Sequence, residues 1–476
     1  MRIYRYLNYA QTFCNPAKNR KFVKISISEK KMSQRLISTL RLGLEERALT
    51  DSNDIRTIFQ RDYDRIIFSS PFRRMQNKTQ VFPLPGSIFV HNRLTHSLEV
   101  ASVGRSLGNM VANQISSQYQ YPANETNEIG SVVAAACLAH DLGNPPFGHS
   151  GETAIANFFK KGKGKDYIDA LPLAMQTDFT LFEGNANAFR LLCHQFNGKR
   201  EGGFALTYST LASIVKYPYE SGLAGNKPKF GFFQSEKEIF TKVAEALKMK
   251  SLSEVPVQYS RYPLVYLVEA ADDICYQVMD LEDAHKLKIL SFDETRKLLL
   301  DFFDPTDDKE LLETIDRNFE TVTDRNERIS YLRALVIGKL VGECASIFTS
   351  EFPKIIEGES VQPLIKQLSG NSDSAMKVVK EISGRQIYND RSVIEIEIAG
   401  HKILGNLMEI FADATMSPDE EFSKKLILLM PEQYRPLNDD TYNRLQSVVD
   451  FISGMTDVYA LDLYRKINGM NLPDLG

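Results

Sequence analysis

The chain has 476 residues, 43% of them hydrophobic and 25% charged, a composition typical of a soluble globular protein with a substantial core. Its formal net charge of −4 excludes a globally basic nucleic-acid-binding surface, so an anionic ligand would need a local cluster of cations. The five widely spaced cysteines include no C-x-x-C pair, which argues against a disulfide framework and favours a reducing, cytoplasmic location.

The chain divides into three predicted regions. Residues 1–44 form a peripheral N-terminal extension without the apolar segment of a signal peptide, and Met32 offers an alternative start of translation. Residues 45–304 are predicted to form the core. Residues 305–476 begin with a highly charged stretch and are predicted to be a helical region packed on the core. No apolar run approaches the roughly 18 residues of a membrane helix, so no membrane partner is expected.

Apolar residues at three-to-four spacing dominate the sequence and predict an all-α fold. Residues 132–142 and 264–283 are apolar around most of the helix surface, which is typical of buried helices. Residues 392–398 (SVIEIEI) alternate as a strand does, which is compatible with a small β-hairpin. Further helices are predicted at residues 235–249, 294–303, 308–322, 328–350, 374–384, 401–415, 421–428 and 440–468.

Four of the seven histidines fall within residues 91–149. His140 and Asp141 follow an apolar helix that a glycine and two prolines terminate, so a buried element presents a nitrogen and a carboxylate at its rim. His96 lies at the start of another predicted helix. Nitrogen and carboxylate ligands together suit a divalent ion of borderline or hard character. His91 is interpreted as a surface or loop histidine.

Two adjacent acids in the apolar helix at residues 264–283 are candidates for a further ligand. A buried carboxylate requires a cation or a hydrogen-bond donor, because its desolvation alone is costly. An ordinary salt-bridged pair is the alternative interpretation. Asp272, Tyr276 and Asp280 are spaced i, i+4, i+8 and share a helix face, which favours Asp272 over Asp273 as the ligand.

Longer blocks surround these residues in a fixed order. They are SSPFRRMQNKTQVFP (69–83), NRLTHSLEVASVGR (92–105), AHDLGNPPFGHSGE (139–152), FEGNANAFRLL (182–192), LTYSTLASIVKYP (206–218), KFGFFQSE (229–236), YPLVYLVEAADDICYQVMDLEDA (262–284) and MTDVYALDLYRKING (455–469). The order H…HD…D resembles the HD-domain metal-dependent phosphohydrolases, and the blocks resemble the deoxyguanosine triphosphate triphosphohydrolases and related dNTP triphosphohydrolases over roughly residues 45–470. The resemblance implies a largely helical fold and one catalytic metal on His96, His140, Asp141 and Asp272.

The resemblance also implies the reaction: water attacks the α-phosphorus of a deoxynucleoside triphosphate, with dGTP favoured, and releases the deoxynucleoside and triphosphate. A divalent metal can polarise the phosphoryl oxygen; Mn or Mg is expected, and the ligands also fit Fe, Co, Ni or Zn. His149 and Glu152 can face one pocket and are implied to be the catalytic dyad. Asn144 stands where two-metal HD phosphodiesterases carry a second histidine, which argues for one metal.

A triphosphate is strongly anionic and requires cationic partners. The resemblance implies phosphate contacts for Arg93, Lys216 and Lys229, although plain surface charge is an alternative for the two lysines. It further implies contacts to the sugar and base region, or a place in the lining of the site, for Gln80, Asn185, Tyr276 and Asp280. A ring packed beneath the 2′ carbon would reject ribonucleotides, because their additional hydroxyl would clash with it.

Members of the resembled family are commonly homo-oligomers, often hexamers, and some bind single-stranded DNA or are activated by nucleotides. We therefore expect a homo-oligomer and consider single-stranded DNA a candidate effector. Two alternatives are a dNTP-sensing or single-stranded-DNA-binding HD protein with little turnover, and an HD nucleotidase acting on 5′-monophosphates. The intact ligand set favours turnover, and the additional lysines favour a triphosphate substrate.

Overall fold

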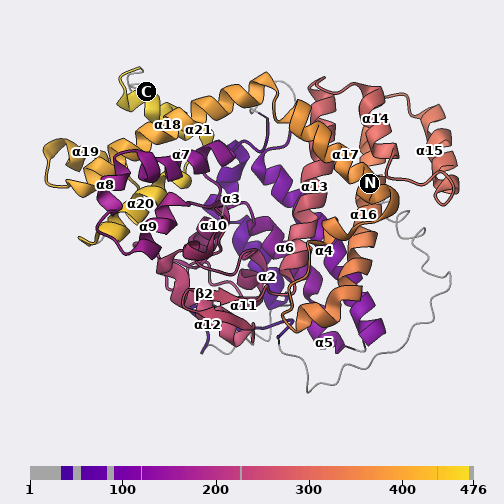
Figure 1. The fold of residues 1–476 in the computed structure, drawn as a ribbon, viewed down its shortest axis with the longest axis horizontal. Helices are drawn as coiled ribbons and strands as arrows, with labels where there is room; N and C mark the ends of the chain where they lie inside the picture. Colours follow the sequence, from indigo (N-terminus) through magenta and orange to yellow (C-terminus); the bar gives the residue numbers. More distant parts are fainter. Residues whose placement is uncertain are drawn as a thin grey trace.

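The computed structural model describes residues 34–46, 55–82, 90–119, 121–225, 228–436 and 438–470. The described residues are mostly helical (Figure 1), and the expected all-α fold class is confirmed. Among them, no helix is both long enough and apolar enough to cross a membrane. The first 33 residues of the predicted N-terminal extension lie outside this part of the chain.

The helices follow one another through mostly short connections. The first group comprises α2 (Ile58–Ile67), α3 (Ser70–Arg74), η2 (Met75–Asn77), α4 (Arg93–Tyr119), α5 (Ala123–Thr126), α6 (Ile129–Ala139), α7 (Gly148–Lys161), α8 (Gly164–Ile168), α9 (Leu173–Thr180), α10 (Gly184–Cys193), α11 (Tyr208–Ile214), η3 (Ser221–Leu223), η4 (Gln234–Glu236) and α12 (Lys237–Ala246). The second comprises α13 (Val265–Lys286), α14 (Phe292–Leu300), α15 (Lys309–Thr321), α16 (Arg325–Ile356), η5 (Leu364–Gln367), α17 (Gly370–Ile382), η6 (Ser383–Ile387), α18 (Arg391–Met416), α19 (Glu421–Leu429), η7 (Glu432–Tyr434), α20 (Thr441–Ser453) and α21 (Asp457–Ile467).

The first hydrophobic core is organised around α4, α6 and α13, which pack against one another (Figure 1). Helix α6 is apolar and buried along its length, as its sequence predicts. It approaches α4 closely because Gly108 and Gly130 face each other: a Cβ on Gly108 would lie 2.8 Å from the Gly130 Cα. A side chain at Gly108 would therefore force the helices apart. This close crossing sets the end of α6 beside the beginning of α4.

A second hydrophobic core joins α7–α9 to the C-terminal helices α18–α21. Helix α18 packs along both α7 and α20, and Figure 1 shows these C-terminal helices around α7. Helix α16, by contrast, packs on α4 and α13 of the first core. The division predicted after residue 304 stays a prediction. What matters for the site is that helices near the C-terminus cover α7, which carries His149 and Glu152.

Residues 392–398 are helical, so the strand-like interpretation of this segment is wrong. They lie in the first turns of α18, which Asp390 caps by accepting a hydrogen bond from the Ser392 N–H at 2.9 Å. Val393 and Gly400 are buried at helical spacing, whereas Ile398 is exposed. Burial every three to four residues, rather than every second residue, is the helical pattern. A small antiparallel hairpin does occur elsewhere, between β1 (Ser251–Glu254) and β2 (Val257–Tyr259).

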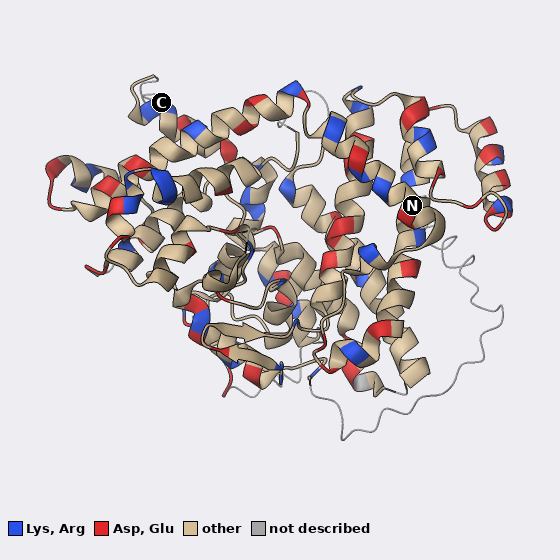
Figure 2. Cartoon of the chain, in the orientation of Figure 1, with Lys and Arg blue, Asp and Glu red and all other residues tan. Residues whose placement is uncertain are grey.

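Acidic residues recur along α13, as Figure 2 shows, although most of this helix is buried. Basic partners from other segments meet several of them. Glu269 pairs with Lys216 and Arg261, and Glu282 pairs with Arg333. Pairing of this kind is what keeps a buried carboxylate ionised. The acids of α13 thus hold several elements of the first core against one helix.

Candidate functional site

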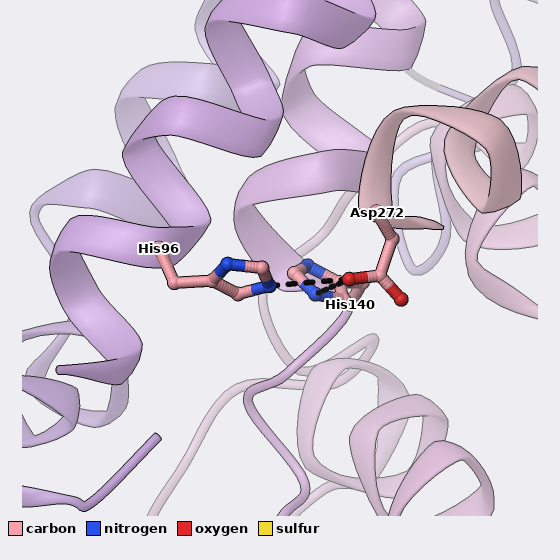
Figure 3. A group of neighbouring side chains, drawn as sticks. All are labelled: His96, His140 and Asp272. Atoms are coloured by element: carbon pink, nitrogen blue, oxygen red, sulfur yellow. Dashed lines mark hydrogen bonds and ion pairs between the residues drawn. The ribbon is translucent and has the colours of Figure 1, made fainter. Parts of the chain in front are cut away.

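His96, His140 and Asp272 converge from three different helices (Figure 3). His96 lies in the first turn of α4, His140 ends α6, and Asp272 lies within α13. The Asp272 Oδ1 is 3.1 Å from the His96 Nε2 and 3.3 Å from the His140 Nε2. Each of the three residues offers one potential ligand atom, and these atoms all lie within 4.8 Å of one another.

The donor atoms of this group fit a divalent cation. The His140 Nδ1 lies 2.6 Å from the Cys137 carbonyl oxygen and donates to it, which leaves the lone pair of the ring on Nε2. That buried Nε2 has no hydrogen-bond partner among the described residues, yet it faces the Asp272 carboxylate. A lone pair and a carboxylate oxygen repel each other unless a proton or a metal cation lies between them. Two imidazole nitrogens and one carboxylate oxygen form a donor set that suits several divalent metals.

Asp141, the fourth predicted ligand, lies beside this group and is held by other partners. Its Oδ2 accepts a hydrogen bond from the Arg93 Nη1 at 2.7 Å, and its Oδ1 accepts one from the Asn144 Nδ2 at 2.6 Å. The same Oδ1 is 3.6 Å from the His140 Nε2. Arg93 and Asn144 therefore orient this carboxylate. Its role as a metal ligand stays a prediction.

His149 and Glu152 form a hydrogen-bonded pair in the first turn of α7. The His149 Nδ1 lies 2.7 Å from the Glu152 Oε2, while the Glu152 Oε1 accepts a hydrogen bond from the Gly184 N–H at 2.8 Å. The two side chains differ sharply in exposure, at 85% for His149 and 12% for Glu152. The hydrogen bond and charge of Glu152 raise the pKa of His149. A buried carboxylate thus fixes the orientation and tautomer of a ring whose Nε2 is left for a ligand.

Lys229 and Asn185 lie near this dyad and share one buried partner, Glu183. The Lys229 Nζ and the Asn185 Nδ2 each lie 2.6 Å from the Glu183 Oε1. Glu183 also caps α10 by accepting a hydrogen bond from the Asn185 N–H at 2.7 Å. Glu183 therefore holds Lys229 in a defined place beside the dyad. The positive charge of Lys229 lowers the pKa of both His149 and Glu152.

Arg93 links Asp141, beside the His96–His140–Asp272 group, to the start of α7. Besides its bond to Asp141, its guanidinium also lies close to the start of α7. The Arg93 Nη2 is 2.9 Å from the position that a Cβ on Gly148 would occupy. Its Nε is buried and has no hydrogen-bond partner within the described part of the chain. Arg93 thus has one donor engaged by a carboxylate and another left for an anion.

Lys216 and Gln80 come from two further segments of the chain. The Lys216 Nζ is 3.1 Å from the Glu269 Oε1, one helical turn before Asp272, so the lysine is held against α13. The Gln80 Oε1 is buried without a hydrogen-bond partner among the residues that the structure describes. A buried amide oxygen of this kind calls for a donor, which a ligand can supply.

Tyr276 and Asp280 both contact Tyr388, a residue that the sequence patterns did not single out. The rings of Tyr276 and Tyr388 stack with centroids 5.8 Å apart. The Tyr388 hydroxyl donates a hydrogen bond to the Asp280 Oδ2 at 2.7 Å. Tyr388 follows the π-helical turn η6, and irregular turns of this type are frequent at functional sites. No local sequence pattern marks Tyr388, because only tertiary packing brings it to α13.

His91 lies in the loop before α4, as the loop interpretation expected, but it is buried and not at the surface. Its Nδ1 lies 2.8 Å from the Asp283 Oδ2 and its Nε2 lies 3.2 Å from Glu99. Burial lowers the pKa of His91, but hydrogen bonds with the two carboxylates raise it to about 10. A cationic His91 thus fastens the segment before α4 to α13, and thereby helps to place His96 opposite Asp272.

Replacing Asp280 by asparagine is expected to stabilise the fold increasingly as pH rises. Burial, opposed by the hydrogen bond from Tyr388, raises the pKa of Asp280 to about 8. In the unfolded chain this carboxyl titrates near about 3.9. The folded state therefore binds more protons between about pH 4 and pH 8, and the stability of the wild type falls as pH rises through this window. Asparagine cannot ionise and removes that dependence.

Urea unfolding of the wild type and Asp280→Asn at several pH values measures this effect. The difference in free energy of unfolding between the two proteins should grow with pH. Asp301→Asn, at an exposed position, is the control and should show no such trend. A constant difference between the wild type and Asp280→Asn across the pH range would contradict the prediction.

The sequence comparisons point to one family. A model of the HD domain matches residues 93–201, and a model of the phosphohydrolase-associated domain matches residues 367–466. A protein of Synechocystis sp. called deoxyguanosinetriphosphate triphosphohydrolase-like is 40% identical over 92% of this chain and 99% of its own length. A Pseudomonas aeruginosa protein with the same name is 37% identical over 92% of this chain and 99% of its own length. A Yersinia enterocolitica deoxyguanosinetriphosphate triphosphohydrolase is 29% identical over 88% of this chain and 95% of its own length.

Proposed function

Because this chain belongs to the deoxyguanosinetriphosphate triphosphohydrolase-like family of HD-domain proteins, we propose that it hydrolyses deoxynucleoside triphosphates, with dGTP favoured. The products would be the deoxynucleoside and inorganic triphosphate. One observation supports the proposal. Arg93 bonds to Asp141 beside the His96–His140–Asp272 group, and it also lies against Gly148, the residue before the His149–Glu152 pair. A cation site, an anion-binding guanidinium and a proton-transfer dyad are the parts that phosphoester hydrolysis requires.

His96, His140 and Asp272 are proposed to hold one divalent ion, with Asp141 as a fourth ligand. Mn or Mg is favoured, and Fe, Co, Ni and Zn suit the same donors. When bound, the ion would polarise a phosphoryl oxygen at the α-phosphorus. The protein's own contribution to proton transfer comes from the His149 Nε2, while Glu152 holds the ring through Nδ1.

The cations around the site would bind the triphosphate. The Arg93 Nε, which has no partner among the described residues, offers a hydrogen-bond donor near the dyad. Lys229, which Glu183 holds through a hydrogen bond, places a positive charge beside the dyad. Lys216 is held by Glu269, one helical turn from Asp272. Charge-assisted hydrogen bonds from such groups are strong and directional. Asn185, which shares Glu183 with Lys229, is proposed to line the same side of the site.

The sugar is proposed to lie against Tyr276 and Asp280. Tyr276 is braced by the stacked ring of Tyr388, and Asp280 retains one carboxyl oxygen outside its bond with Tyr388. A braced ring beneath the 2′ carbon would discriminate against ribonucleotides by steric exclusion. The unpartnered Gln80 Oε1 would accept a hydrogen bond from the sugar or base.

Incubation with each of the four dNTPs and either Mn²⁺ or Mg²⁺ is expected to release triphosphate and deoxynucleoside in equal amounts, fastest from dGTP. Ion-exchange chromatography separates the products. Release of pyrophosphate or orthophosphate in place of triphosphate would contradict the proposal. Turnover of dGMP alone would instead favour the nucleotidase alternative, and the absence of turnover with every dNTP would favour a sensing or DNA-binding role.

The wider properties of the protein stay predictions. Homo-oligomerisation, up to a hexamer, is tested by sedimentation. Single-stranded DNA as an effector is tested by a salt-dependent shift of labelled DNA. A cytoplasmic location is tested by cell fractionation.

A further inference from the structure

The turn that leads into His149 is held by a carboxylate from near the C-terminal end of the chain. Asp457 is the first residue of α21 and is buried. Its Oδ1 accepts a hydrogen bond from the Phe147 N–H at 3.0 Å. Phe147 and Gly148 have φ angles of 60° and 58°, so two successive left-handed residues turn the chain just before His149. A left-handed residue other than glycine persists only where its surroundings impose that conformation.

The second oxygen of the same carboxylate holds another part of the site. The Asp457 Oδ2 accepts a hydrogen bond from the Thr79 N–H at 2.8 Å. Thr79 pairs with Asn92 in an isolated bridge, and the Arg93 N–H donates to the Lys78 carbonyl at 3.2 Å. The segment that Asp457 holds is therefore attached to the beginning of α4. One carboxylate thus connects the segments that precede His96 and His149.

Other contacts from the C-terminal helices converge on the same loop. The buried Lys78 Nζ donates to the Asn144 carbonyl at 2.6 Å and to the Ser453 carbonyl at 2.8 Å. The Asn187 Nδ2 donates to the Gly143 carbonyl at 2.6 Å and to the Ser453 Oγ at 3.1 Å. The loop between the His-Asp pair and the dyad is therefore tied, directly or through Lys78 and Asn187, to the end of α20 and the start of α21.

The side chain of Phe147 is fixed from the same region. Phe147 packs against Gly400 of α18, where the absence of a Cβ leaves room for its ring. Both the backbone and the side chain of this left-handed residue are thus set by residues within the segment that matches the phosphohydrolase-associated domain.

We propose that Asp457 is a positioning residue of the active site: by holding the Phe147–Gly148 turn, it sets the geometry of the His149–Glu152 dyad. This inference rests on the proposed function, which makes that dyad catalytic. It gives the phosphohydrolase-associated segment a defined part in the reaction, since α21 supplies the group that shapes a turn in the HD domain.

The carboxylate is specifically suited to this position. Both groups that it meets are backbone N–H donors, and each of its oxygens accepts from one of them. An asparagine would keep one acceptor but turn an amide donor toward the other N–H. The repelled N–H should displace the side chain, so Asp457→Asn should loosen its hold on both segments without changing the volume of the side chain.

The matched variants Asp457→Asn and Asp462→Asn test the proposal. Asp462 lies on the same helix, half exposed, and pairs with Lys466 at 2.8 Å. Asp457→Asn is expected to lower kcat for dGTP about tenfold or more, because small displacements of catalytic groups are costly, with little change in KM. Asp462→Asn should behave as the wild type. Binding of Mn²⁺, followed by calorimetry, should change less than about twofold in both variants, because the three donor side chains remain.

Two further readouts separate positioning from a merely structural role. In hydrogen–deuterium exchange, the peptide spanning residues 143–152 should exchange faster in Asp457→Asn alone. In the pH profile of kcat, the inflection of His149 should move to lower pH in Asp457→Asn, because a looser bond to Glu152 raises the pKa of His149 less. The charged groups that face His149 are Glu152 on α7, Lys229 and Arg93, and all three remain in the variant.

The outcomes are distinct. An unchanged kcat, unchanged exchange of residues 143–152, or a lower kcat with an unshifted pH profile would each overturn the proposal. If Asp457→Asn fails to fold, Asp457→Glu takes its place; it keeps both acceptor oxygens but displaces them, and it should show the same loss of kcat and the same shift of inflection. An inactive wild type would overturn the proposed function, and the hold on the turn would then be judged by exchange, where unchanged rates would overturn it as well.

Discussion

Replacing Asp272 by alanine is expected to abolish metal binding and to lower turnover by about 10³-fold or more, because a Lewis acid contributes several kcal/mol to phosphoryl chemistry. The Asp272 Oδ1 is the atom that the Nε2 atoms of both His96 and His140 face, at 3.1 and 3.3 Å. Its removal takes away the only carboxylate of the three-residue donor group found in the described residues. Metal content after dialysis, measured by mass spectrometry, is the direct test.

Asp273→Ala is the matched control for this experiment. Asp273 is the next residue of the same apolar helix, but its carboxylate is not part of the donor group in the described part of the chain. The Asp273→Ala variant should therefore retain its metal. A readout independent of turnover is the thermal midpoint: a ligand at 100 times its Kd stabilises a fold by about 2.7 kcal/mol. Mn²⁺ should therefore raise the midpoint of the wild type and of Asp273→Ala, but not that of Asp272→Ala. Equal effects in the two variants would contradict the assignment.

Periodicity predicted most of the helical fold, because burial in a helical protein repeats every three to four residues. The buried helices predicted at residues 132–142 and 264–283 correspond closely to α6 and α13. The segment at 392–398 was mispredicted because its short run of alternating isoleucine and glutamate mimics a strand. Its capping by Asp390 and the packing of the rest of α18 on α7 determine its conformation instead.

Residues whose roles depend on tertiary contacts could not be predicted from the sequence. Asp457 lies in a recognisable block, but nothing in the sequence states that its carboxylate meets the backbone of Phe147, 310 residues away. Tyr388 and His91 are comparable cases, since each acquires its partner on α13 only when the chain folds. The placement of His96, His140 and Asp272 was more accessible, because unusual polar residues in apolar helices indicate that they meet a cation or one another.

Replacing His149 by alanine is expected to lower kcat by about 10²- to 10⁴-fold, the usual contribution of a general acid or base, while leaving metal binding intact. The imidazole lies outside the donor group, and its Nδ1 is engaged by Glu152 at 2.7 Å. Its loss therefore removes the proton-transfer group without altering the ligands. His401→Ala is the control: this exposed histidine of α18 contacts Asn157 on the same helix as His149 and should leave kcat unchanged.

The partner variant Glu152→Gln distinguishes a dyad from two independent residues. Glutamine keeps an oxygen that can accept from the Gly184 N–H, so the local fold should persist, but it no longer carries the charge that raises the pKa of His149. The double variant combines His149→Ala with Glu152→Gln. If the two residues act as a unit, it should lose little more activity than His149→Ala alone, because effects within a catalytic unit are not additive. Multiplicative losses in the double variant would show instead that Glu152 has a separate role, and would point to its contact with the start of α10 rather than to the orientation of the imidazole.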